Sequence, residues 1–150
     1  MPQNDVRPRL IFTAQSKLHF YCRDAVCEYV FLNGGVPLNP FRLFDYFLSD
    51  RVSRDSVRDA NRAIAARSDE IWVFGETLAD GVLEEIELAH TLNIPLCYLS
   101  IATRADDIRR LDVGDLQFEP ELIMAAGNDI ESLRRVVRGE SPLKSVLQSE

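Results

Sequence analysis

One glutamate stands out because its predicted helix turns it toward the protein interior. Residues 78–92 have the apolar spacing of a helix that is buried on one face. We expect that face to consist of Val82, Ile86, Ala89 and Leu92. Glu85 falls within the same arc, whereas Glu84 and Glu87 fall on the opposite, solvated side. An unpaired carboxylate against a core costs several kcal/mol, so Glu85 either has a partner or lines a cavity.

The position of Glu85 along this helix favours the cavity. Thr77 and Asp80 are expected to cap the helix start, and Gly81 permits close approach of a ligand. In the second turn, the positive end of the helix would keep Glu85 ionised and nucleophilic. The alternative is a glutamate at the edge of the core that reaches solvent or pairs with an arginine.

Other reactive residue types show no metal or redox pattern. Cys22, Cys27 and Cys97 form no CxxC pair, and His19 and His90 have no ligand spacing with them. We therefore expect no metal site, no cofactor and no disulfide, and we interpret all three cysteines as reduced structural residues.

A row of arginines recurs between the predicted strands. It comprises Arg51, Arg54, Arg58, Arg62 and Arg67. Because Asp50, Asp55 and Asp59 lie among them, a solvated face with internal salt bridges is the first interpretation. Binding of a ligand anion is the alternative.

Apolar runs alternate with helical patterns along the chain, which predicts a three-layer α/β domain with a parallel sheet and helices on both faces. The expected strands are 18–22, 36–38 at an edge, 71–74 and 94–101. The expected helices are 23–33, 41–48, 53–67, 78–92 and 130–137, and the pattern between 102 and 128 is weak. Ligands of such sheets bind beyond the carboxyl ends of the strands. The segments that follow Cys22, Leu38, Phe74 and Tyr98 are therefore the places to look.

Composition limits the class of protein. The 150 residues, 46% of them hydrophobic, suit one domain, which we assign to 17–150 after an N-terminal extension at 1–16. A net charge of -7 argues against nucleic-acid polymers and anionic membranes as partners. No apolar run is long enough to span a bilayer, and residues 1–16 lack a secretory pattern, so we expect a cytoplasmic protein.

Several segments together resemble the nucleoside 2-deoxyribosyltransferase-like superfamily. They are KLHFY at 17–21, GVPLNP at 35–40, SDEIWVFG at 68–75, DGVLEEIELA at 80–89 and NIPLCY at 93–98. The most telling motif is an aspartate before a strand, then GxxxE opening the next helix and a small residue one turn later. Asp69, Gly81, Glu85 and Ala89 occupy those positions. The resemblance implies a flavodoxin-like fold and cleavage of the N-glycosidic bond of nucleosides or nucleotides.

The resemblance also implies roles for single residues. Glu85 would attack the anomeric carbon and form a glycosyl ester, which a second base or water resolves. His19 falls near an aromatic position that hydrogen-bonds the nucleophile, and it either assists or simply lies on the first strand. Asn61 falls near an acid that handles the leaving base, but an amide cannot relay a proton, so hydrolysis is favoured over transfer. Asp69 more often supports structure.

The substrate-binding residues are less closely matched. Relatives that bind nucleoside monophosphates carry a Gly-rich loop after the first strand, whereas residues 21–24 pass directly into a helix. Arg23, with Asp80 and Gly81, would then contact the ligand, or Arg23 is an ordinary surface residue. Asn39 would contact the sugar or base, or it forms the turn before Pro40.

Three functions follow from these patterns. The first is hydrolysis of a nucleoside or nucleotide derivative, and the second is nucleotide binding or sensing without turnover. The third is assembly, with an aromatic cluster as interface: Phe41, Phe44, Tyr46, Phe47 and Leu48. Relatives often build the pocket across a dimer, so we expect a homodimer or higher homo-oligomer.

Overall fold

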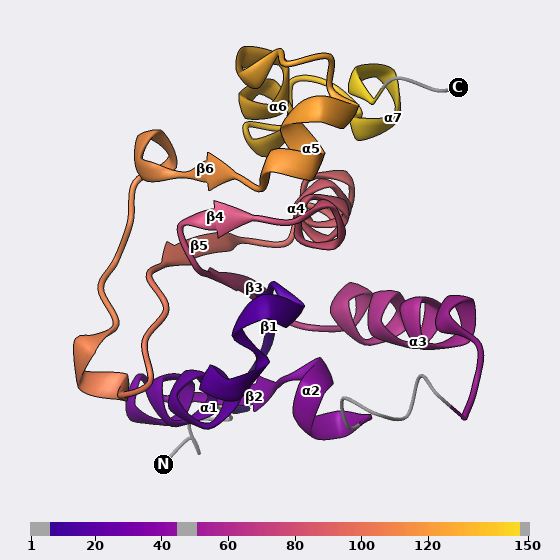
Figure 1. Cartoon of the computed structure of the whole chain (residues 1–150). Coiled ribbons are helices and arrows are strands. Elements are labelled where there is room, and N and C mark those ends of the chain that lie inside the picture. The colour runs from indigo at the N-terminus through magenta and orange to yellow at the C-terminus, as the bar shows by residue number, and fades with distance from the viewer. Residues whose placement is uncertain (1–6, 45–50, 148–150) are drawn as a thin grey trace.

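A four-stranded parallel sheet forms the centre of the computed structural model, which describes residues 7–44 and 51–147 (Figure 1). The strand order is β2-β1-β3-β5, and every neighbouring pair is parallel. The strands are β1 (Arg9–Gln15), β2 (Gly35–Leu38), β3 (Glu70–Phe74) and β5 (Leu96–Leu99). The predicted edge strand is confirmed, since β2 lies at one end of this order.

The first strand is not where the sequence led us to expect it. Residues Lys17–Cys22 form a 3-10 helix, η1, and β1 lies earlier, within the segment that we had assigned to an N-terminal extension. The Ser16 hydroxyl accepts a hydrogen bond from the amide of Leu18 at 3.2 Å, which starts η1 and ends the strand. Because the buried run from Ile11 occupies the middle of the sheet, the extension at 1–16 is corrected: residues 9–15 belong to the domain.

Alternate side chains of the strands enter two separate cores, which makes three layers. Ile11 and Trp72 pack with α1 (Arg23–Leu32) on one face. On the other face Phe12 and Ile71 pack with residues of α3 (Arg54–Ala66) and α4 (Asp80–Leu92). The fold is therefore a three-layer α/β fold of the flavodoxin-like kind, as predicted.

The C-terminal residues contain η3 (Ala105–Asp107), η4 (Val113–Asp115), β6 (Gln117–Phe118), α5 (Pro120–Ala125), α6 (Ile130–Val137) and α7 (Leu143–Val146). The 3-10 helix η3 contacts α1, whereas α5, α6 and α7 cover α4 from the side away from the sheet (Figure 1). Strand β6 pairs with β4 (Thr77–Leu78) in a second, parallel two-stranded sheet. The buried surface of α4 differs from the expected face, because these elements also cover its outer side. Leu83 and Leu88 are buried, whereas Leu92 is 45% exposed.

Glu87 is a third correction on α4. Its carboxylate is partly buried and accepts a hydrogen bond from the amide of Leu143 at 2.7 Å, so it caps α7 instead of lying on a solvated face. The packing partner that makes this possible lies 56 residues further along the chain.

Two smaller expectations concern the remaining segments. The predicted helix 41–48 is the short α2 (Pro40–Leu43), and Tyr46, Phe47 and Leu48 lie outside the described residues. Among the residues that the structure describes, no helix has the length and apolar character needed to cross a membrane.

Candidate active site

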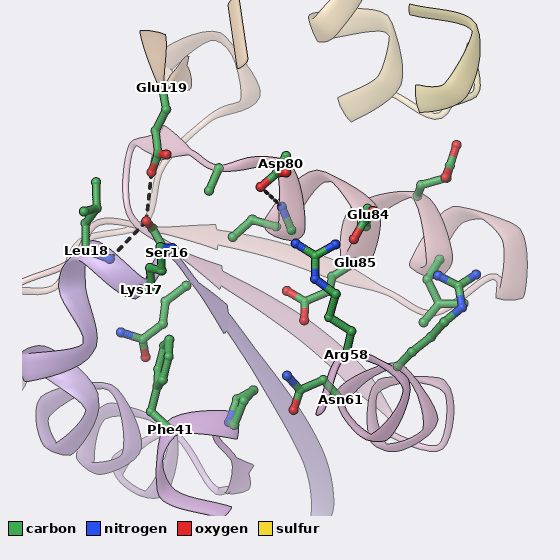
Figure 2. Close-up of a pocket in the computed structure, with 18 of the residues that line it drawn as sticks. Ser16, Lys17, Leu18, Phe41, Arg58, Asn61, Asp80, Glu84, Glu85 and Glu119 are labelled. Carbon is green, nitrogen blue, oxygen red and sulfur yellow. Dashed lines mark hydrogen bonds between the residues drawn. The ribbon is translucent and has the colours of Figure 1, made fainter. Parts of the chain in front are cut away.

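A cavity of about 960 Å³ lies where α3 and the first turns of α4 meet the end of β1 (Figure 2). Gln15 and Ser16, at the end of β1, form part of its wall, so the cavity lies beyond the carboxyl ends of the parallel strands. Its volume is within the range of sites that bind small molecules.

Glu85 lines this cavity from the second turn of α4. Its carboxylate is partly buried and makes no hydrogen bond or ion pair within the described residues. The interpretation as a core-edge glutamate paired with an arginine is therefore wrong, and the cavity interpretation is confirmed. Burial, reinforced by the nearby Glu84 carboxylate, raises the pKa of Glu85 to about 8. This direction is opposite to the expectation that the start of the helix keeps Glu85 ionised.

The start of α4 lies beside Glu85 in the cavity wall. The helix begins at Asp80, two residues later than expected, with Ala79 as its N-cap, whereas Thr77 belongs to β4 and does not cap it. The Asp80 carboxylate accepts a hydrogen bond from the amide of Gly81 at 2.8 Å. A methyl group placed on Gly81 would meet no atom within 4 Å, so this glycine is open to a ligand.

Asn61 faces the same cavity from α3, and Figure 2 places it near Glu85. Its Oδ1 atom is buried and has no hydrogen-bond partner in the part of the chain that the structure describes. An acceptor left in this state costs about 1–3 kcal/mol unless a ligand or water supplies a donor. Asn61 therefore carries an unsatisfied hydrogen-bond acceptor beside the cavity.

Two arginines of α3 also reach the cavity. Arg58 and Arg62 lie one helical turn apart and line it together with Asp55 and Asp59. None of these four side chains forms an ion pair within the described residues. The predicted solvated face is confirmed, because all four residues are exposed, but the predicted salt bridges are not formed here, and the two guanidinium groups have no acidic partner among the described residues.

The rim opposite α3 comes from residues that the sequence analysis missed. The Ser16 hydroxyl donates a hydrogen bond to the Glu119 carboxylate at 2.8 Å, and this contact joins the end of β1 to the start of α5 (Figure 2). Glu121 lines the cavity next to it. The pattern between 102 and 128 gave no signal for either residue, because the elements there are too short to show a period.

Asn39 supports the site and does not line it. Its side chain is 1% exposed and donates hydrogen bonds to Thr13 Oγ1 and Gln15 Oε1, both at 2.8 Å. Its Oδ1 accepts from the amide of Phe41 at 3.0 Å, which caps α2. The turn interpretation is confirmed, and the direct contact with sugar or base is wrong. Asn39 instead holds Gln15 in the cavity wall.

His19 and Arg23 are not brought to the cavity. His19 lies in η1, and its backbone carbonyl accepts from Gln15 Nε2 at 2.8 Å. Arg23 donates to the carbonyl of Phe20 at 3.1 Å and stacks on the Phe20 ring. Both proposed site roles are therefore corrected. The expectation that the first strand passes directly into a helix at residues 21–24 is also corrected, because η1 separates β1 from α1.

Asp69 has a structural role, and the three cysteines form no disulfide among the described residues. The Asp69 carboxylate accepts from the amide of Leu10 at 2.7 Å and fastens β3 to β1. Cys22, Cys27 and Cys97 are free thiols.

Residues 12–99 match the model of a family described as a domain of unknown function, DUF7768. The chain belongs to this family. The DUF7768 match contains Asn61, Gly81 and Glu85 and extends to the end of β5, whereas Glu119 and Glu121 lie beyond it. The cavity of this DUF7768 protein is thus built mainly from family residues, with a rim from the C-terminal segment. Comparison with curated proteins gives no match.

Proposed function

We propose that the protein hydrolyses the N-glycosidic bond of a nucleoside or nucleotide derivative with Glu85 as nucleophile. The observation that carries the proposal is the unpartnered carboxylate of Glu85 in the wall of the cavity. A protein does not bury such a group without cost, and destabilising groups of this kind concentrate at functional sites.

The reaction proceeds in two steps. A carboxylate oxygen of Glu85 bonds to the anomeric carbon while the C–N bond breaks and the base leaves with the bonding electrons. Water then attacks the same carbon, which releases the free sugar and restores the carboxylate. Asn61 Oδ1 accepts a donor of the sugar or base and so orients it for attack.

The second candidate is a binding or sensing module without turnover. The raised pKa of Glu85 favours it, because a carboxyl group protonated at pH 7 is a hydrogen-bond donor and a poor nucleophile. In that case the Glu85 proton would be donated to an acceptor on the ligand.

A base-release assay tests the proposal. Nucleosides and nucleotides are first screened by thermal shift, and each hit is then assayed for free base by chromatography. Glu85→Gln keeps the shape of the side chain but cannot form the ester, so base release should fall by about a thousandfold or more. Glu28→Gln is the matched control, since Glu28 is exposed on α1 across the sheet from the cavity. Hits without base release in the unmodified protein would favour the sensing module, and base release that survives Glu85→Gln would overturn the nucleophile.

A further inference from the structure

We propose that the natural substrate is a nucleoside without phosphate whose base carries a positive charge on the glycosidic ring, such as an N-glycosyl pyridinium or an N-alkylated purine nucleoside. This inference rests on the proposed hydrolysis and concerns the same cavity. It is supported by the charge of the cavity wall, by the state of its helix terminus and by the chemistry of the leaving group.

The wall of the cavity is strongly acidic. Eight acidic side chains line it against three basic ones, Lys17, Arg58 and Arg62. The two arginines share α3 with Asp55 and Asp59, so that helix contributes no net charge to the wall. The excess of carboxylates comes from α4 and from the start of α5. No ion pair of the described residues involves any of them. Such a wall attracts a cation and repels a phosphate.

One backbone amide of the helix terminus at the cavity is already bonded to a carboxylate. A helix N-terminus is the usual backbone site for a phosphate. At α4 the Asp80 carboxylate takes the amide of Gly81, and that carboxylate would itself repel a phosphate dianion. A neutral sugar hydroxyl meets no such obstacle. Asn61 Oδ1 has no hydrogen-bond partner among the described residues, so it can accept a hydrogen bond from that hydroxyl or from a carboxamide or amino group on the base.

A cationic base also leaves without help. When the C–N bond of a neutral nucleoside breaks, the base departs as an anion unless a proton is delivered to it. When the ring nitrogen already carries a positive charge, the electron pair of the C–N bond cancels that charge and the base departs neutral. The water of the second step supplies the new hydroxyl group of the sugar, and its remaining proton goes to solvent. Asn61, the amide beside Glu85, therefore has only to orient the substrate.

The substrate charge would also activate the nucleophile. Burial keeps the Glu85 carboxyl protonated near neutral pH, and a positive charge a few ångströms away favours the ionised form. A cationic substrate would thus bring about the loss of the proton that blocks attack, whereas a neutral or phosphorylated one would not.

Matched compounds test the inference. Affinities of the Glu85→Gln protein for N7-methylguanosine and guanosine are compared by calorimetry. Because this variant cannot form the ester, the comparison measures recognition apart from the intrinsic lability of the glycosidic bond in the cation. We expect about tenfold tighter binding of the methylated nucleoside at low salt, and a smaller ratio at high salt. In the unmodified protein, nicotinamide riboside should lose its base faster than its 5′-phosphate.

Charge variants refine the test. The double variant Glu84→Gln/Glu121→Gln removes two carboxylates of the wall and should reduce the binding ratio. Asp107→Asn, at an exposed position away from the cavity, should leave it unchanged. Equal binding of guanosine, or preference for the 5′-phosphate, would overturn the cationic substrate while base release continued to support hydrolysis. Selective binding of the cation without base release from any compound would support the charge argument and overturn hydrolysis.

Discussion

The proton on Glu85 couples the stability of the protein to pH. In the folded state the pKa is about 8, whereas an exposed glutamate titrates near 4.5. The folded protein thus holds a proton that the unfolded chain releases, and stability is lost as pH rises from about 4.5 to about 8. Glu84 is the charged neighbour that raises this pKa further, and the other charged groups that line the same cavity are Lys17, Asp55, Arg58, Asp59, Arg62, Asp80, Glu87, Glu119 and Glu121.

Glu85→Gln should remove this pH dependence. We expect the variant to match the parent at pH 5 and to exceed it at pH 8.5 by on the order of 2 kcal/mol, after allowance for partial solvent screening. Denaturant unfolding at a series of pH values measures the difference, with Glu28→Gln as control. A variant that unfolds more easily than the parent at pH 8.5 would mean that the carboxylate has a partner.

Asn39 does not line the cavity, yet its loss should disturb the cavity wall. Asn39→Ala removes two buried hydrogen bonds and the α2 cap, so we expect a cost of about 2–4 kcal/mol. Asn33→Ala is the control, because its side chain makes one bond at an exposed position and should cost less than about 1 kcal/mol. Equal midpoints of the two variants in urea would contradict the proposed support of Gln15.

The sequence could predict Glu85 but not its surroundings. A period of 3.6 residues is a local property, and it is enough to place Glu85 on an inward arc of one helix. The rim formed by Ser16 and Glu119 joins residues 103 positions apart, and no local pattern encodes such a pair. Asn39 shows a further limit, since a buried amide and a ligand-contacting amide have the same sequence signature.

At the scale of elements, the sequence predicts segments with a clear apolar period and does not predict those that are too short to show one. Helix α6 spans Ile130–Val137, as expected, because its apolar stripe is clear. Strands β4 and β6 have two residues each, too few to show an alternation. Strand β1 was missed because charged residues precede it, and because the apolar residues of η1 offered a competing candidate directly after it.

The junction between α6 and α4 offers a prediction at this scale. Gly139 has φ +77°, and a methyl group on it would approach Nδ1 of His90 on α4 to 2.7 Å. Gly139→Ala should therefore cost about 1–3 kcal/mol, from strain in the backbone and from displacement of His90. Gly114→Ala meets no atom within 4 Å and should stay within about 0.5 kcal/mol of the parent. Thermal unfolding compares the two, and an unchanged midpoint for Gly139→Ala would refute the close packing.

At the scale of the whole molecule, the C-terminal helices and the sheet should unfold together. Leu133 on α6 is fully buried in the core that includes Phe12 and Val73 of the sheet. Trp72, the only tryptophan, lies in the other core, against α1. Leu133→Ala should cost about 2–5 kcal/mol and shift the transition followed by Trp72 fluorescence as far as that followed by circular dichroism.

Met124→Ala is the control for this test, because Met124 is 73% exposed on α5. We expect it to stay within about 0.5 kcal/mol of the parent. A Trp72 transition that stays in place while the circular dichroism shifts would show that α6 unfolds as an independent unit.

The place of β1 in the sheet determines the order in which the molecule can assemble during synthesis. Its residues are translated first, yet they pair with β2 about one helix later and with β3 only when Glu70 opposite Ile11 has been made. At roughly 5–20 residues per second, an apolar strand waits about 3–12 seconds on the ribosome for its second neighbour. Pairing with β2 and cover from α1 come first, so one edge and one face of the nascent sheet are protected early. The other edge of β1 stays open until β3 emerges, and that interval is when the chain most needs a chaperone.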